Sequence, residues 1–265
     1  MTESTVAVGE AGLYVQESGA GDVLVFVHGF ALDHRLWDAQ TAYFQNNWHI
    51  IRYDLRGFGR SSRLTKQPYR HADDLIGLLD HFEIDSASVV GLSLGARIAL
   101  DTALLYPDRV RSLTLVGAIL EDYEWSSDTL DWRRQSWSAA LSGDIRAAKR
   151  AWLSGALFTP ALGNARAYDA LMQMNDDFHG DHFVRENPEL FLNPPPLRRL
   201  PEIVQPAQII IGDRDMRDVQ AIAKLMVDQL PHADINTMIG VGHLPNLENP
   251  GVFNYTLARF LERLD

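Results

Sequence analysis

The chain has 265 residues, of which 46% are hydrophobic and 22% are charged, so it can bury one large core and lacks the composition of a disordered protein. The formal net charge is −11 at pH 7, which argues against nucleic acid as a partner because phosphate binding needs concentrated lysine and arginine. There are no cysteines, which excludes disulfides, thiolate metal ligands and a cysteine nucleophile.

The first ten residues, "MTESTVAVGE", lack the basic start and apolar core of a secretory signal. The longest strongly apolar window, "VLVFVHGFAL", is too short to cross a bilayer. With the absence of cysteines, these features predict a soluble, cytoplasmic protein that does not associate with membranes. We expect it to be a monomer or a homodimer.

Short β-rich runs alternate with helical patterns along the chain. Strands that are apolar on both faces and separated by helices indicate an α/β fold, with a mostly parallel sheet covered by helices on both faces. The first two runs are close enough in sequence to form a hairpin. The predicted strands cover residues 13–18, 23–29, 48–54, 86–92, 111–117, 207–213 and 233–239.

The fourth of these runs continues into "VVGLSLG", in which Ser93 lies between Gly91 and Gly95. A helical pattern of small and apolar residues follows at once and stops at Pro107. A buried strand, a sharp turn and a helix in direct succession form a nucleophile elbow, in which small neighbours let the chain turn tightly and expose one hydroxyl. Ser93 is therefore the predicted nucleophile.

The alternation of strands and helices stops between residues 121 and 200. We predict that this segment is a helical cap inserted into a core domain made of residues 1–120 and 201–265, and that "NPPPLRRLP" at its end is a stiff, extended connector. Most of its aromatic side chains are expected to form the cap's own core, and a few to face the cleft. Four of the 6 tryptophans lie here: Trp125, Trp132, Trp137 and Trp152.

A serine hydroxyl becomes a good nucleophile only when a base takes its proton and a carboxylate orients that base. His243, in "GVGHLPNLENP", follows the last predicted strand and lies between Gly242 and Pro245. It therefore belongs to a loop at the carboxyl end of the strand, where ligands bind in open α/β sheets. His232 precedes the same strand and would lie at the wrong end of the sheet.

Two pairs of acidic residues are candidates for the carboxylate that orients the base. Asp213 and Asp215 come just after a buried strand, and Glu121 and Asp122 come after the preceding one. The order serine, acid, histidine fits both pairs, so the pattern alone does not choose between them.

Four segments together resemble the α/β-hydrolase superfamily over nearly the full length of the chain: "VFVHGF", "YDLRGFGRSS", "GLSLG" and "GDRD…GVGHLPNLENP". The resemblance implies an eight-stranded type of sheet with a helical cap. It also implies that Asp215 is the acid, that His243 is the base, and that the backbone N–H groups of Phe30 and Leu94 form the oxyanion hole. Phe58 stands where the family often has histidine, outside the catalytic set.

These residues predict a serine hydrolase that cleaves a small-molecule carboxylic ester or lactone through an acyl-enzyme. No metal-ligand motif and no phosphate-binding glycine-lysine run occurs, so we expect neither a metal nor a cofactor. The residues expected to contact the substrate are His28, Gly29, Arg97, Trp125, Trp152 and Leu244.

Arg97 lies one helical turn after Ser93 and leaves an alternative open. It could bind a substrate carboxylate, as in similar family members that cleave C–C bonds or eliminate carboxylates, including the menaquinone-pathway synthase. The protein would then be a C–C bond hydrolase or a lyase. The simpler expectation is an i,i+4 pair with Asp101 on the outer face of the helix. A third hypothesis is a ligand-binding member that does not turn over substrate.

Overall fold

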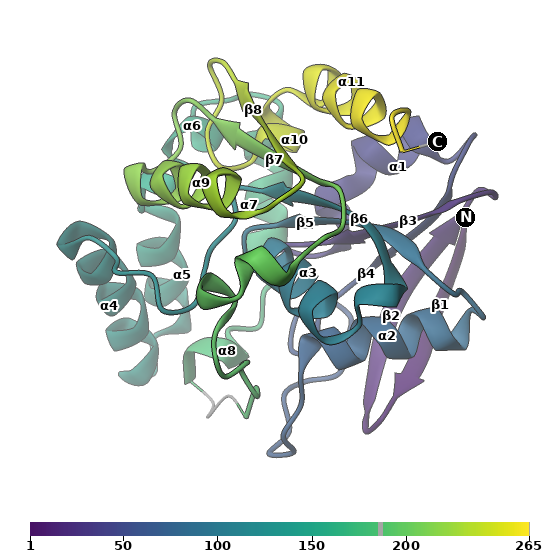
Figure 1. Ribbon diagram of the computed structural model, residues 1–265. Helices are drawn as coiled ribbons and strands as arrows, with labels where there is room; N and C mark the ends of the chain where they lie inside the picture. Colours follow the sequence, from purple (N-terminus) through teal and green to yellow (C-terminus); the bar gives the residue numbers. More distant parts are fainter. Residues whose placement is uncertain (185–187, 265) are drawn as a thin grey trace.

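The computed structural model describes residues 1–184 and 188–264 and contains one eight-stranded sheet (Figure 1). The strand order is β1-β2-β4-β3-β5-β6-β7-β8. All neighbouring strands from β4 to β8 are parallel, and β2 is antiparallel to both β1 and β4. The predicted α/β class with a mostly parallel sheet is confirmed. The strands are β1 (Thr2–Val8), β2 (Ala11–Ser18), β3 (Val23–Val27), β4 (His49–Tyr53), β5 (Ala87–Leu92), β6 (Val110–Val116), β7 (Ala207–Gly212) and β8 (Ala233–Met238).

The predicted hairpin between the first two apolar runs is wrong, because β4 lies between β2 and β3. The antiparallel partner of β2 at the edge of the sheet is β1. The strand β1 was not predicted, because its segment, "TESTVAV", is mostly exposed and is apolar only in its last three residues. An edge strand needs little apolar surface, since only part of it faces the core.

Helices cover both faces of the sheet. In Figure 1, α1 and α11 lie on the side opposite α2 and α3. α3 is buried on all sides from Leu94 to Ala103, which explains its small and apolar residues. The helices of the sheet layers are α1 (Asp38–Phe44), α2 (His71–His81), α3 (Leu94–Leu105), α9 (Arg217–Gln229), α10 (Pro245–Glu248) and α11 (Pro250–Leu261), with the 3₁₀ helices η1 (His34–Trp37) and η2 (Pro107–Arg109).

Between β6 and β7 the chain forms helices and, among the residues described there, no strand of the sheet. One isolated bridge joins Glu189 to Tyr69. Figure 1 shows α4 and α5 beside one end of the sheet, away from the helices that cover its faces. That residues 121–200 form a separate cap domain stays a prediction. The elements are α4 (Ser127–Leu141), α5 (Ile145–Leu153), η3 (Ala156–Phe158), α6 (Thr159–Leu162), α7 (Ala167–Asp177) and α8 (Asp181–Val184).

The segment "NPPPLRRLP" is not the extended connector that its prolines suggested. The 3₁₀ helix η4 (Pro196–Arg198) lies within it and η5 (Leu200–Glu202) begins in it, each with a proline in its first turn. Proline favours this position because its fixed φ suits a helical turn and its missing N–H would have no partner there. In the described part of the chain, no helix combines the length and the apolar character that a membrane span requires.

The tight contact of α3 with β3 leads to a stability prediction. Gly95→Ala should lower the free energy of unfolding by about 1–3 kcal/mol, because its methyl group would lie 2.2 Å from the carbonyl oxygen of Val27. Gly251→Ala in the first turn of α11 is the matched control, since the nearest atom is Asn249 Oδ1 at 4.0 Å. Urea unfolding measures both variants. Equal midpoints for Gly95→Ala and the wild type would show that the contact is not tight.

Candidate active site

Ser93 occupies the turn between β5 and α3 in a conformation that few non-glycine residues adopt, with φ +55° and ψ −108°. Its N–H donates to the carbonyl of Val116 at 2.8 Å, which fixes the turn to the neighbouring strand. The turn is so tight that a Cβ on Gly91 would lie 2.2 Å from the carbonyl oxygen of Gly95. The two flanking glycines therefore permit a strained backbone, and strain of this kind is concentrated at functional sites.

The loops after β7 and β8 bring Asp215 and His243 together. The Nδ1 atom of His243 lies 2.9 Å from Oδ2 of Asp215, and both side chains are buried. Oδ1 of the same carboxylate accepts a hydrogen bond from the N–H of Met216 at 2.7 Å. Among the described residues, Nε2 of His243 has no hydrogen-bond partner although it is buried. The imidazole is thus held by one nitrogen, and the other nitrogen is left to act on a neighbouring group.

The alternative acids lie elsewhere. Asp213 is exposed and accepts a hydrogen bond from the N–H of Gly240 at 2.6 Å. Asp122 pairs with Arg198 on the surface at 2.5 Å. Glu121 lies 3.9 Å from Nε of Arg97. Of the four carboxylates considered, the structure brings only Asp215 to His243.

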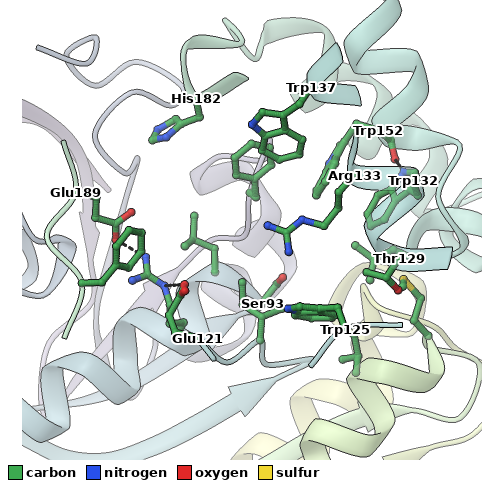
Figure 2. A pocket seen from close by; sticks show the side chains of 18 of the residues that line it. Ser93, Glu121, Trp125, Thr129, Trp132, Arg133, Trp137, Trp152, His182 and Glu189 are labelled. Atoms are coloured by element: carbon green, nitrogen blue, oxygen red, sulfur yellow. Dashed lines mark hydrogen bonds and ion pairs between the residues drawn. The ribbon is translucent and has the colours of Figure 1, made fainter. Parts of the chain in front are cut away.

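Ser93 opens into a cavity of about 320 Å³ (Figure 2). Phe30 and Leu94, the expected oxyanion residues, also line it, and neither of their N–H groups donates a hydrogen bond within the described residues. All four tryptophans of the segment between β6 and β7 line the cavity, more than the few that the sequence suggested. Trp132 stacks on Trp152 with ring centroids 4.5 Å apart. The cavity therefore has a largely aromatic wall.

The other expected contact residues divide into two groups. Arg97, Trp125 and Trp152 line the cavity, whereas His28, Gly29 and Leu244 are not among its lining residues. His28 is fully buried, and its Nε2 accepts a hydrogen bond from the N–H of Leu55 at 2.9 Å. Burial lowers the pKa of His28, so the ring is neutral at pH 7. Its contacts support the loop after β4 and do not reach a ligand in the cavity.

Arg97 pairs with Asp101 at 3.0 Å, but the pair is not on an outer face, because α3 is buried there and only 2% of Arg97 is exposed. The same guanidinium also forms an ion pair with Glu189 and has Glu121 3.9 Å from its Nε. Burial raises the pKa of Asp101 to about 7, with the nearby carboxylates adding to the rise and Arg97 opposing it. Arg97 is therefore shared among three carboxylates.

Several cavity residues were not predicted from the sequence, and Arg133 is the most distinctive of them because it places a cation in the aromatic wall. The spacing of residues in the sequence could have indicated the position of Arg133. Thr129, Arg133 and Trp137 recur every fourth residue, as expected for one face of a helix, and Trp125 stands four residues before Thr129, just ahead of α4. All four line the cavity. His71 and His182 also line it, and burial lowers the pKa of both, so both rings are neutral at pH 7. Neither ring nitrogen of His71 has a hydrogen-bond partner among the described residues, whereas Nε2 of His182 lies 3.1 Å from the carbonyl oxygen of Arg56.

One buried group has the composition of a metal site. Ligand atoms of Asp33, His34 and Asp54 lie within 4.8 Å of one another. Protein donors already occupy these oxygens: Asp54 accepts from the N–H and ring of His34, both at 2.7 Å, and Asp33 accepts from the guanidinium of Arg35. The group therefore serves to fasten the loop after β3, and it does not face the Ser93 cavity.

The chain is similar to known proteins over nearly its full length. The 3-oxoadipate enol-lactonase 2 of Acinetobacter baylyi is 23% identical over 273 residues, which cover 99% of this chain and 98% of the relative. An enzyme called Est816, described as degrading N-acyl homoserine lactones, is 26% identical with a TM-score of 0.78 over 97% of this chain and 100% of its own. The esterase RhEst1 from Rhodococcus sp. ECU1013 has a TM-score of 0.83 at 22% identity, with 100% of both chains covered.

A sequence model of the family described as alpha/beta hydrolase fold matches residues 22–250. The match includes β3 to β8, the elbow at Ser93 and both loops that supply Asp215 and His243. The strand order and the full-length relatives lead to the same family. The chain therefore belongs to the alpha/beta hydrolase fold family, as its motifs predicted.

Proposed function

We propose that the protein hydrolyses a carboxylic ester or lactone, with Ser93 as nucleophile, His243 as base and Asp215 as the carboxylate that orients the base. The main support is the 2.9 Å contact between His243 Nδ1 and Asp215 Oδ2. The other ring nitrogen of His243, Nε2, is buried and has no hydrogen-bond partner among the described residues. An imidazole held in this way is the arrangement that activates a serine in other hydrolases.

In the proposed reaction, Nε2 of His243 takes the proton of Ser93 Oγ as this oxygen bonds to the acyl carbon. The negative charge that develops on the carbonyl oxygen is stabilised by the N–H groups of Phe30 and Leu94, each worth roughly 3–4 kcal/mol of the barrier. The bond to the leaving alkoxide breaks, and the alkoxide takes the proton from His243. Water then gives a proton to His243 and attacks the acyl carbon. The bond from this carbon to Ser93 Oγ breaks, Oγ takes the proton back from His243, and the acid is released. In a lactone, the alkoxide stays attached to the acyl chain.

The helices of residues 121–200 would act as a cap over this site. Their tryptophans line the cavity beside Ser93, and removal of water by such a wall strengthens the electrostatic contacts of the transition state. The enol-lactonase, lactone-degrading and esterase names of the relatives support an ester or lactone as the substrate class. The alternative of a C–C hydrolase or lyase depends on Arg97, and Asp101 and Glu189 already bind that guanidinium.

Ser93→Ala should abolish ester hydrolysis and leave the free energy of unfolding almost unchanged, because it removes one hydroxyl from a turn that the backbone maintains. A fluorophosphonate probe should label the wild type and fail to label the variant, since only an activated serine reacts. Hydrolysis of 4-nitrophenyl esters gives the rates. Activity of the variant within tenfold of the wild type would rule out Ser93 as the nucleophile.

Asp215→Asn should lower kcat by several orders of magnitude, because an amide at this position favours the wrong tautomer of His243. Asp213→Asn is the matched control two residues away in the same loop, where the carboxylate contacts only the N–H of Gly240 among the described donors. It should keep kcat within about threefold of the wild type, since exposed substitutions have small effects. Steady-state kinetics measure kcat for both variants. A larger loss of kcat in Asp213→Asn than in Asp215→Asn would identify Asp213 as the carboxylate that orients His243.

A further inference from the structure

Arg133 is a cation inside the cavity that contains Ser93. It comes from α4, and Figure 2 shows its guanidinium directed from that helix into the cavity, with Trp125 on one side and Trp137 on the other. The Cζ atom lies 5.8 Å from the ring centroids of both tryptophans. Aromatic faces at this distance stabilise a guanidinium and limit its directions. The planar group is thus held in place with its N–H donors available.

No carboxylate among the described residues forms an ion pair with Arg133. The nearest acidic influence is Glu121, which lies beside Nε of Arg97 at 3.9 Å. Burial lowers the pKa of Arg133, with Glu121 opposing the shift, yet a guanidinium remains charged at neutral pH. A partly buried charge without a partner is unfavourable, so a ligand that supplies a negative charge would gain from meeting it.

Two other arginines, Arg97 and Arg134, differ from Arg133 because carboxylates form ion pairs with them. Arg97 lines the same cavity, but Asp101 and Glu189 occupy its guanidinium. Arg134, the next residue of α4, is exposed and pairs with Asp131 at 2.6 Å. Only Nε of Arg97 lacks a hydrogen-bond partner among the described residues, and the Glu121 carboxylate lies 3.9 Å from it, whereas no carboxylate pairs with any donor of Arg133 there.

The position of Arg133 relative to the proposed catalytic residues is fixed through Asp218. Oδ2 of Asp218 accepts hydrogen bonds from the hydroxyl groups of Ser126 at 2.7 Å and Thr129 at 2.5 Å, at the start of α4. Asp218 stands in the first turn of α9, three residues after Asp215. The helix that presents Arg133 is therefore fastened to the same segment that holds the acid of the proposed catalytic set.

We propose that Arg133 binds a carboxylate of the substrate, so that the ester or lactone cleaved at Ser93 belongs to a dicarboxylic acid or another acid with a free carboxylate beyond the scissile carbonyl. A guanidinium recognises a carboxylate through paired N–H donors, and the tryptophan walls accept the carbon chain between the two ends. The part of this inference that concerns cleavage rests on the proposed function. The part that concerns carboxylate binding does not.

The kinetic test uses esters that differ only in charge. The mono-4-nitrophenyl esters of adipate, pimelate and suberate, whose chains are too long for rapid attack of the carboxylate on its own ester, are each compared with the ester in which the free carboxylate is replaced by a primary amide. The wild type should have the higher kcat/KM for the acid in at least one pair. Arg133→Gln should reduce the acid-to-amide ratio of kcat/KM by about 10- to 100-fold, mainly through KM, as expected for loss of a charge-assisted hydrogen bond. Arg133→Lys should keep part of the preference.

Arg134→Gln is the matched control, since it removes the same charge from the same helix outside the cavity. Its acid-to-amide ratio should stay within about twofold of the wild-type ratio, because its charge is exposed and screened. The proposal is overturned if the wild type prefers the amide in all three pairs, or if Arg133→Gln and Arg133→Lys leave the ratio unchanged. It is also overturned if Arg134→Gln lowers the ratio as much as Arg133→Gln, since the effect would then come from net charge.

A binding test separates this inference from the proposed function. Calorimetric titration of the Ser93→Ala variant with monomethyl adipate and with its neutral amide analogue measures recognition without cleavage. The acid should bind about 10-fold or more tightly than the amide, and adding Arg133→Gln should remove the difference. If the wild type hydrolyses none of the esters but this preference is present, the proposed function fails and the carboxylate site stands. If the esters are hydrolysed and both ligands bind equally, the carboxylate site fails and the proposed function stands.

Discussion

The close contact between β5 and α3 is the constraint on which the site depends. Because Gly91 and Gly95 have no Cβ, the helix can begin directly above the sheet, and the backbone of Ser93 is forced to a positive φ. Its hydroxyl then lies at the carboxyl edge, where β7 and β8 also end. The loops that follow those two strands bring Asp215 and His243 to the same edge. A parallel sheet therefore collects residues far apart in the sequence at one place.

Much of this arrangement could be predicted from the sequence because it is coded locally. The inner parallel strands are mostly apolar runs, unlike β8 at the edge, and the elbow is a strand, a glycine-flanked serine and a helix in succession. His243 was recognisable as a loop residue after the last strand. The choice of Asp215 over Asp213 was open from the pattern alone, since the two differ only by how the turn after β7 directs each side chain. The structure directs one to His243 and the other to Gly240.

The remaining features depend on packing between distant segments. β1 is stabilised by its pairing with β2, so its own residues give no apolar signal. Arg97 was placed on an outer face because the helix period shows which residues share a face and not what covers them. In the structure, Glu189, which comes 92 residues after Arg97 in the chain, binds the Arg97 guanidinium and covers it. Arg133 was overlooked although its four-residue spacing with neighbouring aromatics was visible, because nothing local showed that this face of α4 borders the cavity.

Both ends of the helical segment between β6 and β7 are fastened to the sheet domain. At one end, Asp218 of α9 binds the first turn of α4, and at the other, Glu189 binds Arg97 in α3 and its backbone bridges to Tyr69. Between these points α7 and α8 are fastened as well, because Asp177 pairs with Arg35 at 2.8 Å and Asp181 pairs with Arg63. Among the described residues, no ion pair joins α5 to the sheet or its covering helices. Evolution can therefore exchange side chains in α5, whose Trp152 lines the cavity, to reshape this wall and change the size of the accepted chain, while the anchored residues keep their places relative to the reacting bond.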